Sequence, residues 1–545
     1  MTDFTINIIL LFLTLSFITF SLIGYGALFA KTFYYEKKNY FSVSHYIIFG
    51  LIFLVFISYY TNLFFGHNEI FNFFLLLVGI LYFVFFELKK KIELSKIVFF
   101  LIIIYFTFFL ISKNHDDFFY YHFSYSLNLV ENKLQFGLSN LKLGYRHHSS
   151  ILHLMSLTYL PIVKYYLFNS INFIAFIFTS FILFENVQKN LNKNNLIMFF
   201  SLLFFILINI KFKRLSEFGT DITAQLFIVI LFLSFLKFFL EKKNKQENLF
   251  IIFIILTLIA SFKISYTLYG IFVLLTLLIY ERSELIKFIF KSKKLLIFLT
   301  LFLIAFLFQN FANNGCLLYP ISQTCFFHDL DWTLKKNEIN EMKIFLELWA
   351  KSGANPHYTI SNKMEYIENF VWLKNWFSNY FLFKVSDFIF LNLGLILLII
   401  LFFKKNIYLE KNFKDKKILY KFFLVILPIF LIWFLKHPSM RYGGYIIFSL
   451  TLFFIFFSFI KFKLNNSKFT QKKITLLIIL SLLYINFSNI NRIYHEINSP
   501  YIYKFDDFPF YALDINLLYK DKLRFLNSKR KIINNYTFYL NDKNN

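Results

Sequence analysis

Residues 219–240 read GTDITAQLFIVILFLSFLKFFL, a run of 22 residues that is almost wholly apolar. Its two ionisable side chains, Asp221 and Lys237, lie toward its two ends. An α-helix needs about 20 consecutive apolar residues to cross the ~30 Å hydrocarbon core of a bilayer. The segment therefore predicts a transmembrane helix whose charges lie near the two membrane surfaces.

The composition of the whole chain agrees with this segment. Of its 545 residues, 58% are apolar and 16% are charged, whereas about 25% are charged in an ordinary soluble domain. A soluble fold could not bury so much apolar surface. The low counts of 14 Gly, 7 Pro and 2 Cys exclude collagen, Pro/Gly-rich disordered chains and disulfide-rich secreted scaffolds. The composition predicts an all-α polytopic membrane protein.

Apolar windows along the chain predict about fourteen transmembrane helices, with twelve as the lower bound. Segment 150–185 is long enough to hold a short interfacial helix followed by a span. The first span lacks the basic start and the short apolar stretch of a cleavable signal peptide. The fourteen segments are 6–30, 46–65, 71–86, 97–111, 150–185, 195–210, 219–240, 249–261, 267–280, 295–311, 387–403, 419–435, 442–460 and 474–487.

The Lys and Arg residues divide the connecting segments into two alternating sets. One set holds 28 Lys and Arg in 85 residues, whereas the short segments of the other hold 10 in 67 residues. Because basic residues favour cytoplasmic loops, the first set is predicted to be cytoplasmic and the second to face the far side of the membrane. The cytoplasmic set is 31–45, 87–96, 186–196, 241–248, 281–294, 404–417 and 461–473.

The net charge of +26 is therefore mostly a topology signal, and nucleic acid is not an expected partner. Both termini are expected on the far side. The sequence has no recognisable duplicated halves, Walker-type phosphate loop or dinucleotide motif. The expected divisions are N-terminal helices (1–96), a transmembrane core with an acidic loop at 112–149 (97–311), a far-side loop (312–386), C-terminal helices (387–487) and a far-side tail (488–545).

The only two cysteines, Cys316 and Cys325, both fall in the predicted far-side loop. A disulfide between them would close a small loop with Pro320 at its turn, as an oxidising compartment allows. Two free thiols are the alternative. A zinc site is not expected, because no second Cys/His pair has suitable spacing.

The strongest polar cluster follows the predicted span 97–111 and begins Asn114-His115-Asp116-Asp117. Two adjacent carboxylates at a membrane surface repel each other unless a cation neutralises the pair. This setting suits a general base or a divalent metal ligand. Asp116 and Asp117 are therefore candidates for both roles, with His115 as a second-choice base. A solvated polar cap would use the same residues.

The same far-side segment ends in a second cluster, Gly144-Tyr145-Arg146-His147-His148-Ser149-Ser150. Arg146 could meet an anionic head group, or the cluster could be an ordinary aromatic and basic interface anchor. Between the two clusters, the residues from Tyr121 to Leu134 predict a short amphipathic helix. Its aromatic and apolar side chains, Tyr125 and Leu129 among them, would lie at the membrane interface.

The third cluster, Lys211-Phe-Lys213-Arg214-Leu-Ser-Glu-Phe-Gly219-Thr-Asp221, carries three cations in four residues on the predicted far side. Such a violation of the charge rule needs a reason, and binding a phosphate is one. The N-terminus of the helix that follows would also favour an anion. An error in the predicted spans is the plainer alternative.

The fourth cluster, Lys436-His437-Pro438-Ser439-Met440-Arg441-Tyr442-Gly443-Gly444, separates two late spans. Pro438 ends the preceding helix, and paired glycines allow a close approach of backbone or ligand. An Arg at this depth is costly unless it pairs with a carboxylate or phosphate. Arg441 and Tyr442 are therefore candidates for phosphate binding, and a snorkelling Arg is the alternative.

Together, the clusters resemble the GT-C superfamily of integral-membrane glycosyltransferases. Asp116-Asp117 resemble the acidic pair of its early far-side loop, and Arg441-Tyr442 resemble the Arg-Tyr near the start of a late span. Similar segments also resemble multi-span bacterial proteins of this type. The likeness covers only short parts of the chain, and the acidic pair follows the fourth predicted span, whereas it usually follows the first in the superfamily.

The resemblance implies an activity and a location. The enzyme would move a sugar from a polyprenyl-phosphate-linked donor to a glycan, lipid or protein acceptor, with inversion. It would lie in the bacterial inner membrane among lipids, with its active site facing the periplasm. Asp116 or Asp117 would be the base and could hold a divalent cation such as Mg or Mn. The donor phosphate would be held by Arg441, Tyr442, Lys211, Lys213, Arg214 and Arg146.

Two other functions stay open at this point. A polymerase or ligase of surface polysaccharide also has many spans and a large far-side loop, but it tends to rely on arginines rather than an early acidic pair. A lipid or polysaccharide transporter or flippase predicts polar residues deep within spans and related halves. Here the conspicuous charges lie at helix ends, and Lys237 and Lys421 lie close enough to the cytoplasmic surface to snorkel.

Overall fold

The fold was taken from a computed structural model, which describes most of the chain. The described residues are 2–35, 41–86, 91–111, 117–191, 195–213, 219–241, 243–325, 330–353, 360, 362–404, 407–408, 416–459, 461–462, 468–498 and 515–541.

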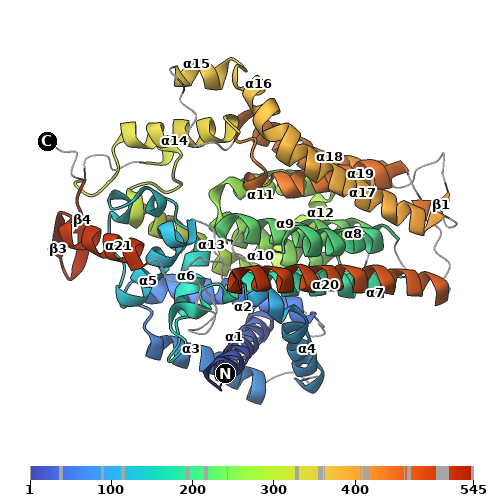
Figure 1. Ribbon diagram of the computed structural model, residues 1–545, viewed down its shortest axis with the longest axis horizontal. Helices are drawn as coiled ribbons and strands as arrows, with labels where there is room; N and C mark the ends of the chain where they lie inside the picture. The colour runs from blue at the N-terminus through green and yellow to red at the C-terminus, as the bar shows by residue number, and fades with distance from the viewer. Residues whose placement is uncertain are drawn as a thin grey trace.

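Helices dominate the described residues, as the apolar composition requires (Figure 1). They are α1 (Thr2–Phe33), α2 (Val43–Thr61), α3 (Glu69–Leu81), α4 (Lys91–Phe109), α5 (Phe123–Glu131), α6 (Ser150–Leu157), α7 (Ser170–Asn190), α8 (Asn195–Lys211), α9 (Gly219–Leu240), α10 (Lys245–Phe262), α11 (Thr267–Tyr280), α12 (Arg282–Lys291), α13 (Lys293–Asn314), α14 (Lys336–Lys351), α15 (Lys363–Glu368), α16 (Trp372–Trp376), α17 (Ser386–Phe402), α18 (Lys416–Lys436), α19 (Gly444–Phe459), α20 (Lys468–Ile497) and α21 (Ile515–Asn527).

Eight helical segments within the described residues are long and apolar enough to cross a membrane, or nine if α11 and α12, which are bent by 112° at their junction, count as one. Three further apolar helices are shorter. Every one of the fourteen predicted segments falls on a helix. The protein is therefore a helical membrane protein, and the number of fourteen spans stays a prediction.

Loops of the predicted cytoplasmic set contact one another at one end of the bundle. Strand β1 (Ile407–Tyr408) pairs with β2 (Lys461–Phe462), which joins the segments that follow α17 and α19. Gln246 donates to Glu284 at 2.7 Å, and Lys245 pairs with Glu281 at 2.6 Å, which joins the start of α10 to the region of α12. The prediction of a loop at 281–294 was wrong, because this segment contains the helix α12.

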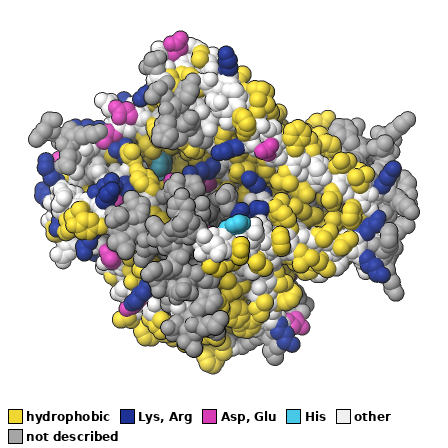
Figure 2. All heavy atoms as spheres, viewed as in Figure 1, with side chains coloured by type: hydrophobic (Ala, Val, Ile, Leu, Met, Phe, Trp, Pro, Cys, Tyr) yellow, Lys and Arg dark blue, Asp and Glu magenta, His cyan; other side chains and the backbone are white. Residues whose placement is uncertain are grey.

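The three large segments that are predicted to lie on the far side, and are called far-side segments from here on, contact one another at the opposite end (Figure 1). Lys142 pairs with Asp521 at 2.7 Å, and both side chains are buried. Arg146 pairs with Glu338 on α14 at 3.1 Å. Figure 2 shows a broad area of hydrophobic side chains over the bundle, with Lys and Arg side chains gathered at the end near β1 and toward the other end. Members of each predicted set thus contact one another, and which end of the bundle faces the cytoplasm stays a prediction.

The far-side tail adds β-structure that the sequence did not indicate. Strands β3 (Arg530–Ile533) and β4 (Tyr536–Tyr539) form an antiparallel hairpin in which Ile533 faces Tyr536. The two turn residues, Asn534 and Asn535, both have positive φ. This conformation suits the twist of a two-residue hairpin, and asparagine tolerates it better than most residues.

The helix predicted from Tyr121 to Leu134 is present but differs in extent and surroundings. A π-helical turn at Phe118–His122 leads into α5, which ends at Glu131. Tyr125 and Leu129, predicted for the membrane interface, are buried inside the protein. The reason is that α6 packs against this helix and the ring of Tyr145 lies against that of Tyr125, which a one-dimensional pattern cannot reveal.

Candidate active site

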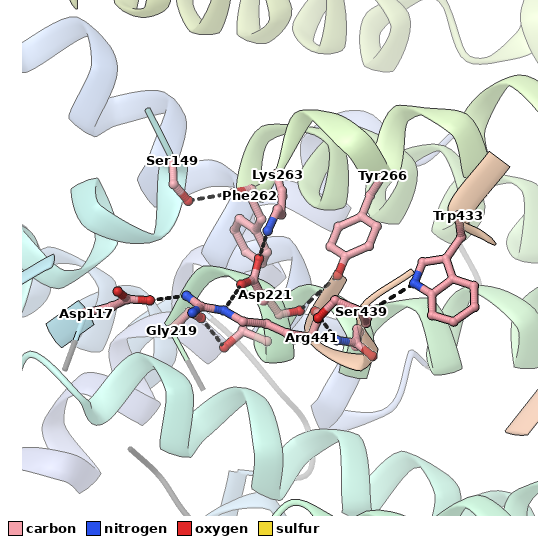
Figure 3. Close-up of polar contacts among 12 residues, drawn as sticks. Asp117, Ser149, Gly219, Asp221, Phe262, Lys263, Tyr266, Trp433, Ser439 and Arg441 are labelled. Atoms are coloured by element: carbon pink, nitrogen blue, oxygen red, sulfur yellow. Dashed lines mark hydrogen bonds and ion pairs between the residues drawn. The ribbon is translucent and has the colours of Figure 1, made fainter. Parts of the chain in front are cut away.

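Four charged side chains meet where the far-side loops cover the bundle: Asp117, Asp221, Lys263 and Arg441 (Figure 3). Arg441 donates from Nε to Asp221 Oδ2 at 2.6 Å and from Nη2 to Asp117 Oδ2. Lys263 Nζ donates to the other oxygen of Asp221. The charges alternate along this four-residue cluster, so each cation lies against a carboxylate.

Asp221 and Lys263 come from two neighbouring antiparallel helices. Asp221 lies in the first turn of α9, and Lys263 directly follows the last residue of α10. Because α9 and α10 are joined by a short loop, the start of one lies beside the end of the other. A carboxylate at a helix N-terminus and an ammonium at a C-terminus are both favoured by the helix dipoles. The sequence therefore places opposite charges side by side.

Serine hydroxyls hold the end of α10 against the far-side loop. Ser149 Oγ donates to the carbonyl of Phe262 at 2.8 Å, and Ser150 Oγ donates to that of Ser261 at 3.1 Å. The last carbonyls of a helix have no partners within the helix, and these hydroxyls supply them. The contacts fix the backbone directly before Lys263.

Two tryptophans hold the loop that carries Arg441, between α18 and α19. Trp376 Nε1 donates to the carbonyl of Pro438 at 2.6 Å. Trp433 Nε1 donates to the carbonyl of Ser439 at 2.9 Å (Figure 3). Buried carbonyls need such partners, and the rigid indole rings fix their positions.

The next two residues of the loop are held in the same way. The backbone N–H of Met440 donates to the hydroxyl of Tyr380, and Gln225 Nε2 donates to the carbonyl of Arg441, both at 2.9 Å. Gln225 lies one turn after Asp221 on α9. Through Gln225 and Asp221, α9 therefore holds both the backbone and the guanidinium of Arg441. These two contacts fix the position of the arginine.

The four charges differ in their access to solvent. The side chain of Asp221 is 5% exposed, whereas those of Asp117 and Arg441 are 24% and 32% exposed. Both oxygens of Asp221 are occupied by cations. Asp117 can therefore meet an incoming molecule, while Asp221 serves to position Lys263 and Arg441.

Burial and neighbouring charges fix the protonation of the surrounding groups. Burial lowers the pKa of Lys263 and Asp221 opposes this, whereas the two carboxylates raise the pKa of Arg441 in spite of its burial. Burial raises the pKa of Tyr121, and Asp117 raises it further. Tyr121 therefore keeps its hydroxyl proton beside the cluster.

A histidine from the second sequence cluster lies next to these charges. Burial, with a smaller contribution from Lys263, lowers the pKa of His147 to about 4. The same cause lowers the pKa of His437, the first residue of the Arg441 loop, to about 4. Both imidazoles are thus neutral near pH 7 and add no charge to the cluster.

Stability should fall between pH 6.5 and pH 4 because of these two histidines. Their folded pKa values lie below the unfolded value of about 6.5, so the unfolded chain binds more protons in this window. The free energy of unfolding therefore decreases by up to about 1.4 kcal/mol per histidine and pH unit as the pH falls. Thermal unfolding in detergent at a series of pH values measures this. H147Q should flatten the profile, and the same change at the exposed His495 should not.

Three other predicted phosphate-binding cations have separate positions. Lys211 lies 4.6 Å from the ring centre of Tyr445, four residues after Arg441. Lys213 donates to the hydroxyl of Tyr484 at 2.9 Å. Arg146 instead pairs with Glu338, and both side chains are largely buried. This contact gives Arg146 a role in joining two far-side segments, which the sequence could not show.

Several candidates cannot be placed. His115, Asp116 and Arg214 lie outside the described residues.

Two further predictions fall on described residues. Tyr442 is adjacent to the cluster, because the Lys263 ammonium lies 4.1 Å from the centre of its ring. Cys316 and Cys325 form a disulfide, with a sulfur–sulfur distance of 2.05 Å.

The predicted metal pair Asp116 and Asp117 is described only in part, because Asp116 lies outside the described residues. The described part of the chain contains no group of three or more His, Cys, Asp or Glu side chains that could hold a metal ion. Asp117 and Asp221, the carboxylates of the cluster, each face at least one cationic side chain.

The sequence predictions missed Asp221 and Lys263 as site residues. Asp221 is the last residue of the third cluster, in which the prediction rested on the three neighbouring cations. Lys263 is the only charged residue between α10 and α11. A usable signal was the helical hairpin itself. Two antiparallel spans joined by a short loop must bring residues at their free ends together, here an acid and a base.

Comparison with known proteins assigns the chain to a family. The model of a family described as a domain of unknown function, DUF8201, matches residues 8–448. No curated protein and no solved structure matches the chain. The match spans more than half of the sequence and includes Asp117, Asp221, Lys263 and Arg441. The chain therefore belongs to the DUF8201 family.

Proposed function

We propose that this protein is an integral-membrane glycosyltransferase of the GT-C kind. It moves a sugar from a polyprenyl-phosphate-linked donor to a glycan, lipid or protein acceptor at the periplasmic face of the bacterial inner membrane. The observation that carries the proposal is the ion pair between Asp117 and Arg441, in which an accessible carboxylate lies against a guanidinium at the far-side end of the bundle.

Asp117 is the general base in this proposal. Its carboxylate accepts the proton of the acceptor hydroxyl while the acceptor oxygen forms a bond to the anomeric carbon. The bond from that carbon to the phosphate oxygen breaks, and its electron pair leaves with the phosphate. Attack from the face opposite the leaving group inverts the anomeric centre. Asp221 does not take this role, because both of its oxygens are held by cations.

Arg441 stabilises the charge that develops on the departing phosphate. Its Nη2 is held by Asp117, so an incoming phosphate competes with this carboxylate for the guanidinium. A phosphate has more charge and more acceptor oxygens than a carboxylate and binds the planar guanidinium well. Donor binding would thus release Asp117 to act as the base. Asp221 keeps Arg441 in place during the exchange.

Two lysines support the same assignment of the donor. Lys211 and Lys213 lie at the end of α8 on the far side, against aromatic rings of α19 and α20. Both ammonium groups are partly exposed, and they lie on the side of the bundle where charge topology disfavours them. A lipid phosphate arriving at this membrane surface accounts for that placement.

Product analysis with defined donors tests the proposal. Membranes that contain the protein are supplied with radiolabelled polyprenyl phosphosugars, with and without EDTA, beside membranes that contain D117N. Wild-type membranes should transfer the label to an acceptor, and D117N membranes should not. Release of the intact labelled donor on the other side of sealed vesicles would point to a flippase instead. Loss of transfer with EDTA would show a metal requirement.

A further inference from the structure

The outer edge of strand β3 is open. Its sheet has two strands, and the far edge of β4 is already occupied, because the N–H of Phe136 donates to the carbonyl of Thr537 at 2.8 Å and its carbonyl accepts from the N–H of Tyr539 at 2.9 Å. The described part of the chain places no strand against the other edge of β3. All four residues of β3 are exposed. We propose that this edge binds an extended acidic segment of a partner protein, which adds a strand to the sheet.

The register of the hairpin determines which backbone groups of β3 face outward. Thr537 and Tyr539 direct their backbone groups toward Phe136, and their partners across the hairpin are Ile532 and Arg530. In an antiparallel pair, residues that face each other direct their backbone groups either both inward or both outward. The N–H and C=O groups of Arg530 and Ile532 therefore point away from β4. They form the row of donors and acceptors to which an added strand can bind.

Each face of β3 carries one cation and one isoleucine. Alternate residues of a strand share a face, so Arg530 lies on the same face as Ile532, and Lys531 lies on the same face as Ile533. Ile532 is 66% exposed and Ile533 is 43% exposed. Neither cation forms an ion pair with a described residue. The edge thus offers two cations and two exposed apolar side chains beside its outward backbone groups.

The charges determine the kind of strand that this edge accepts. Opposite charges on neighbouring strands stabilise a sheet, whereas like charges destabilise it. A second copy of β3 would bring two further cations and no carboxylate, so pairing with another copy is disfavoured. An antiparallel strand with the order apolar, apolar, acidic, acidic would place its apolar residues beside Ile533 and Ile532 and its acids beside Lys531 and Arg530. Such a segment satisfies the backbone groups, the cations and the isoleucines together.

Synthetic peptides test the proposal. The matched peptide is fluorescent, is capped at both ends and has the core Val-Val-Glu-Glu between two serines. The control peptide has the core Val-Glu-Val-Glu, which keeps the composition and the charge but places both acids on one face of the strand. Binding to the full-length protein in neutral detergent is measured by fluorescence anisotropy. The matched peptide should bind at least tenfold more tightly than the control peptide.

Variants of β3 separate strand addition from attraction by charge alone. R530E combined with K531E should weaken binding of the matched peptide at least tenfold, and this variant should instead bind a peptide with the core Val-Val-Lys-Lys. K336E combined with K363E makes the same charge change on α14 and α15 and should leave the binding unchanged. I532P should also weaken binding at least tenfold, because proline lacks the outward N–H but leaves the hydrogen bonds to β4 in place.

Two kinds of result would overturn the inference. Equal binding of the two acidic peptides, or equal effects of the two double variants, would show attraction by net charge alone. An I532P variant that binds the matched peptide as tightly as the wild type would show that no strand is added at this edge.

Discussion

Replacement of Asp117 by asparagine should reduce sugar transfer by about 10²–10⁴-fold, the usual contribution of a general base. The amide cannot accept the proton of the acceptor hydroxyl. It can still accept a hydrogen bond from Arg441, so the fold around the cluster should survive. Initial rates of transfer in membranes with matched amounts of protein measure the effect.

The control for this prediction is D331N, which removes an exposed far-side carboxylate away from the four-residue cluster and should not change the rate. R441A separates the proposed enzyme from its nearest alternative. A glycosyltransferase with an aspartate base should retain some transfer without Arg441, whereas an arginine-dependent polymerase or ligase should lose more with R441A than with D117N. D117N that keeps more than about a tenth of the wild-type rate would remove Asp117 as the base.

Replacement of Asp221 by asparagine should destabilise the fold by about 3–5 kcal/mol, which is typical when one partner of a buried ion pair is lost. The variant leaves Lys263 and the Arg441 Nε without the carboxylate that neutralises both. Thermal unfolding of the purified protein in detergent measures the change.

A double-mutant cycle makes this prediction specific to the contact. K263M should also destabilise the protein, and D221N combined with K263M should cost less than the sum of the two single changes, because the second change removes a charge that the first left unpaired. E365Q, an exposed change on α15, should have little effect. Additive losses in the double variant would contradict the proposed coupling between Asp221 and Lys263.

Hydropathy and charge were enough to predict the general fold. Apolar runs such as 219–240 became helices because a buried or lipid-facing backbone must satisfy its own hydrogen bonds. The Lys and Arg counts grouped loops that do contact one another, as the contacts of Lys245 and Lys142 with partners from their own sets show. Helix formation depends on short windows of sequence and could be predicted from them, whereas the orientation in the membrane stays a prediction.

The candidate site was predictable only in part. Asp117 and Arg441 could be expected to meet, because each is a charge that needs a partner at the same membrane surface. The partner of Arg146 could not be expected, because Glu338 is 192 positions away in a loop whose path depends on tertiary packing. The tryptophans that hold the Arg441 loop were equally hidden, because an indole N–H that caps a distant carbonyl has no local sequence pattern.

The C-terminal segment that contains the hairpin is synthesised after the far-side residues that it contacts. Phe538 of β4 pairs with Phe136, Asp521 of α21 neutralises Lys142, and Asn541 donates to Glu338, the partner of Arg146. These residues leave the ribosome after all the bundle helices α1–α20. The loop that follows Asp117 can therefore form its final contacts only after the C-terminal segment has been synthesised. By then, all the bundle helices have left the ribosome.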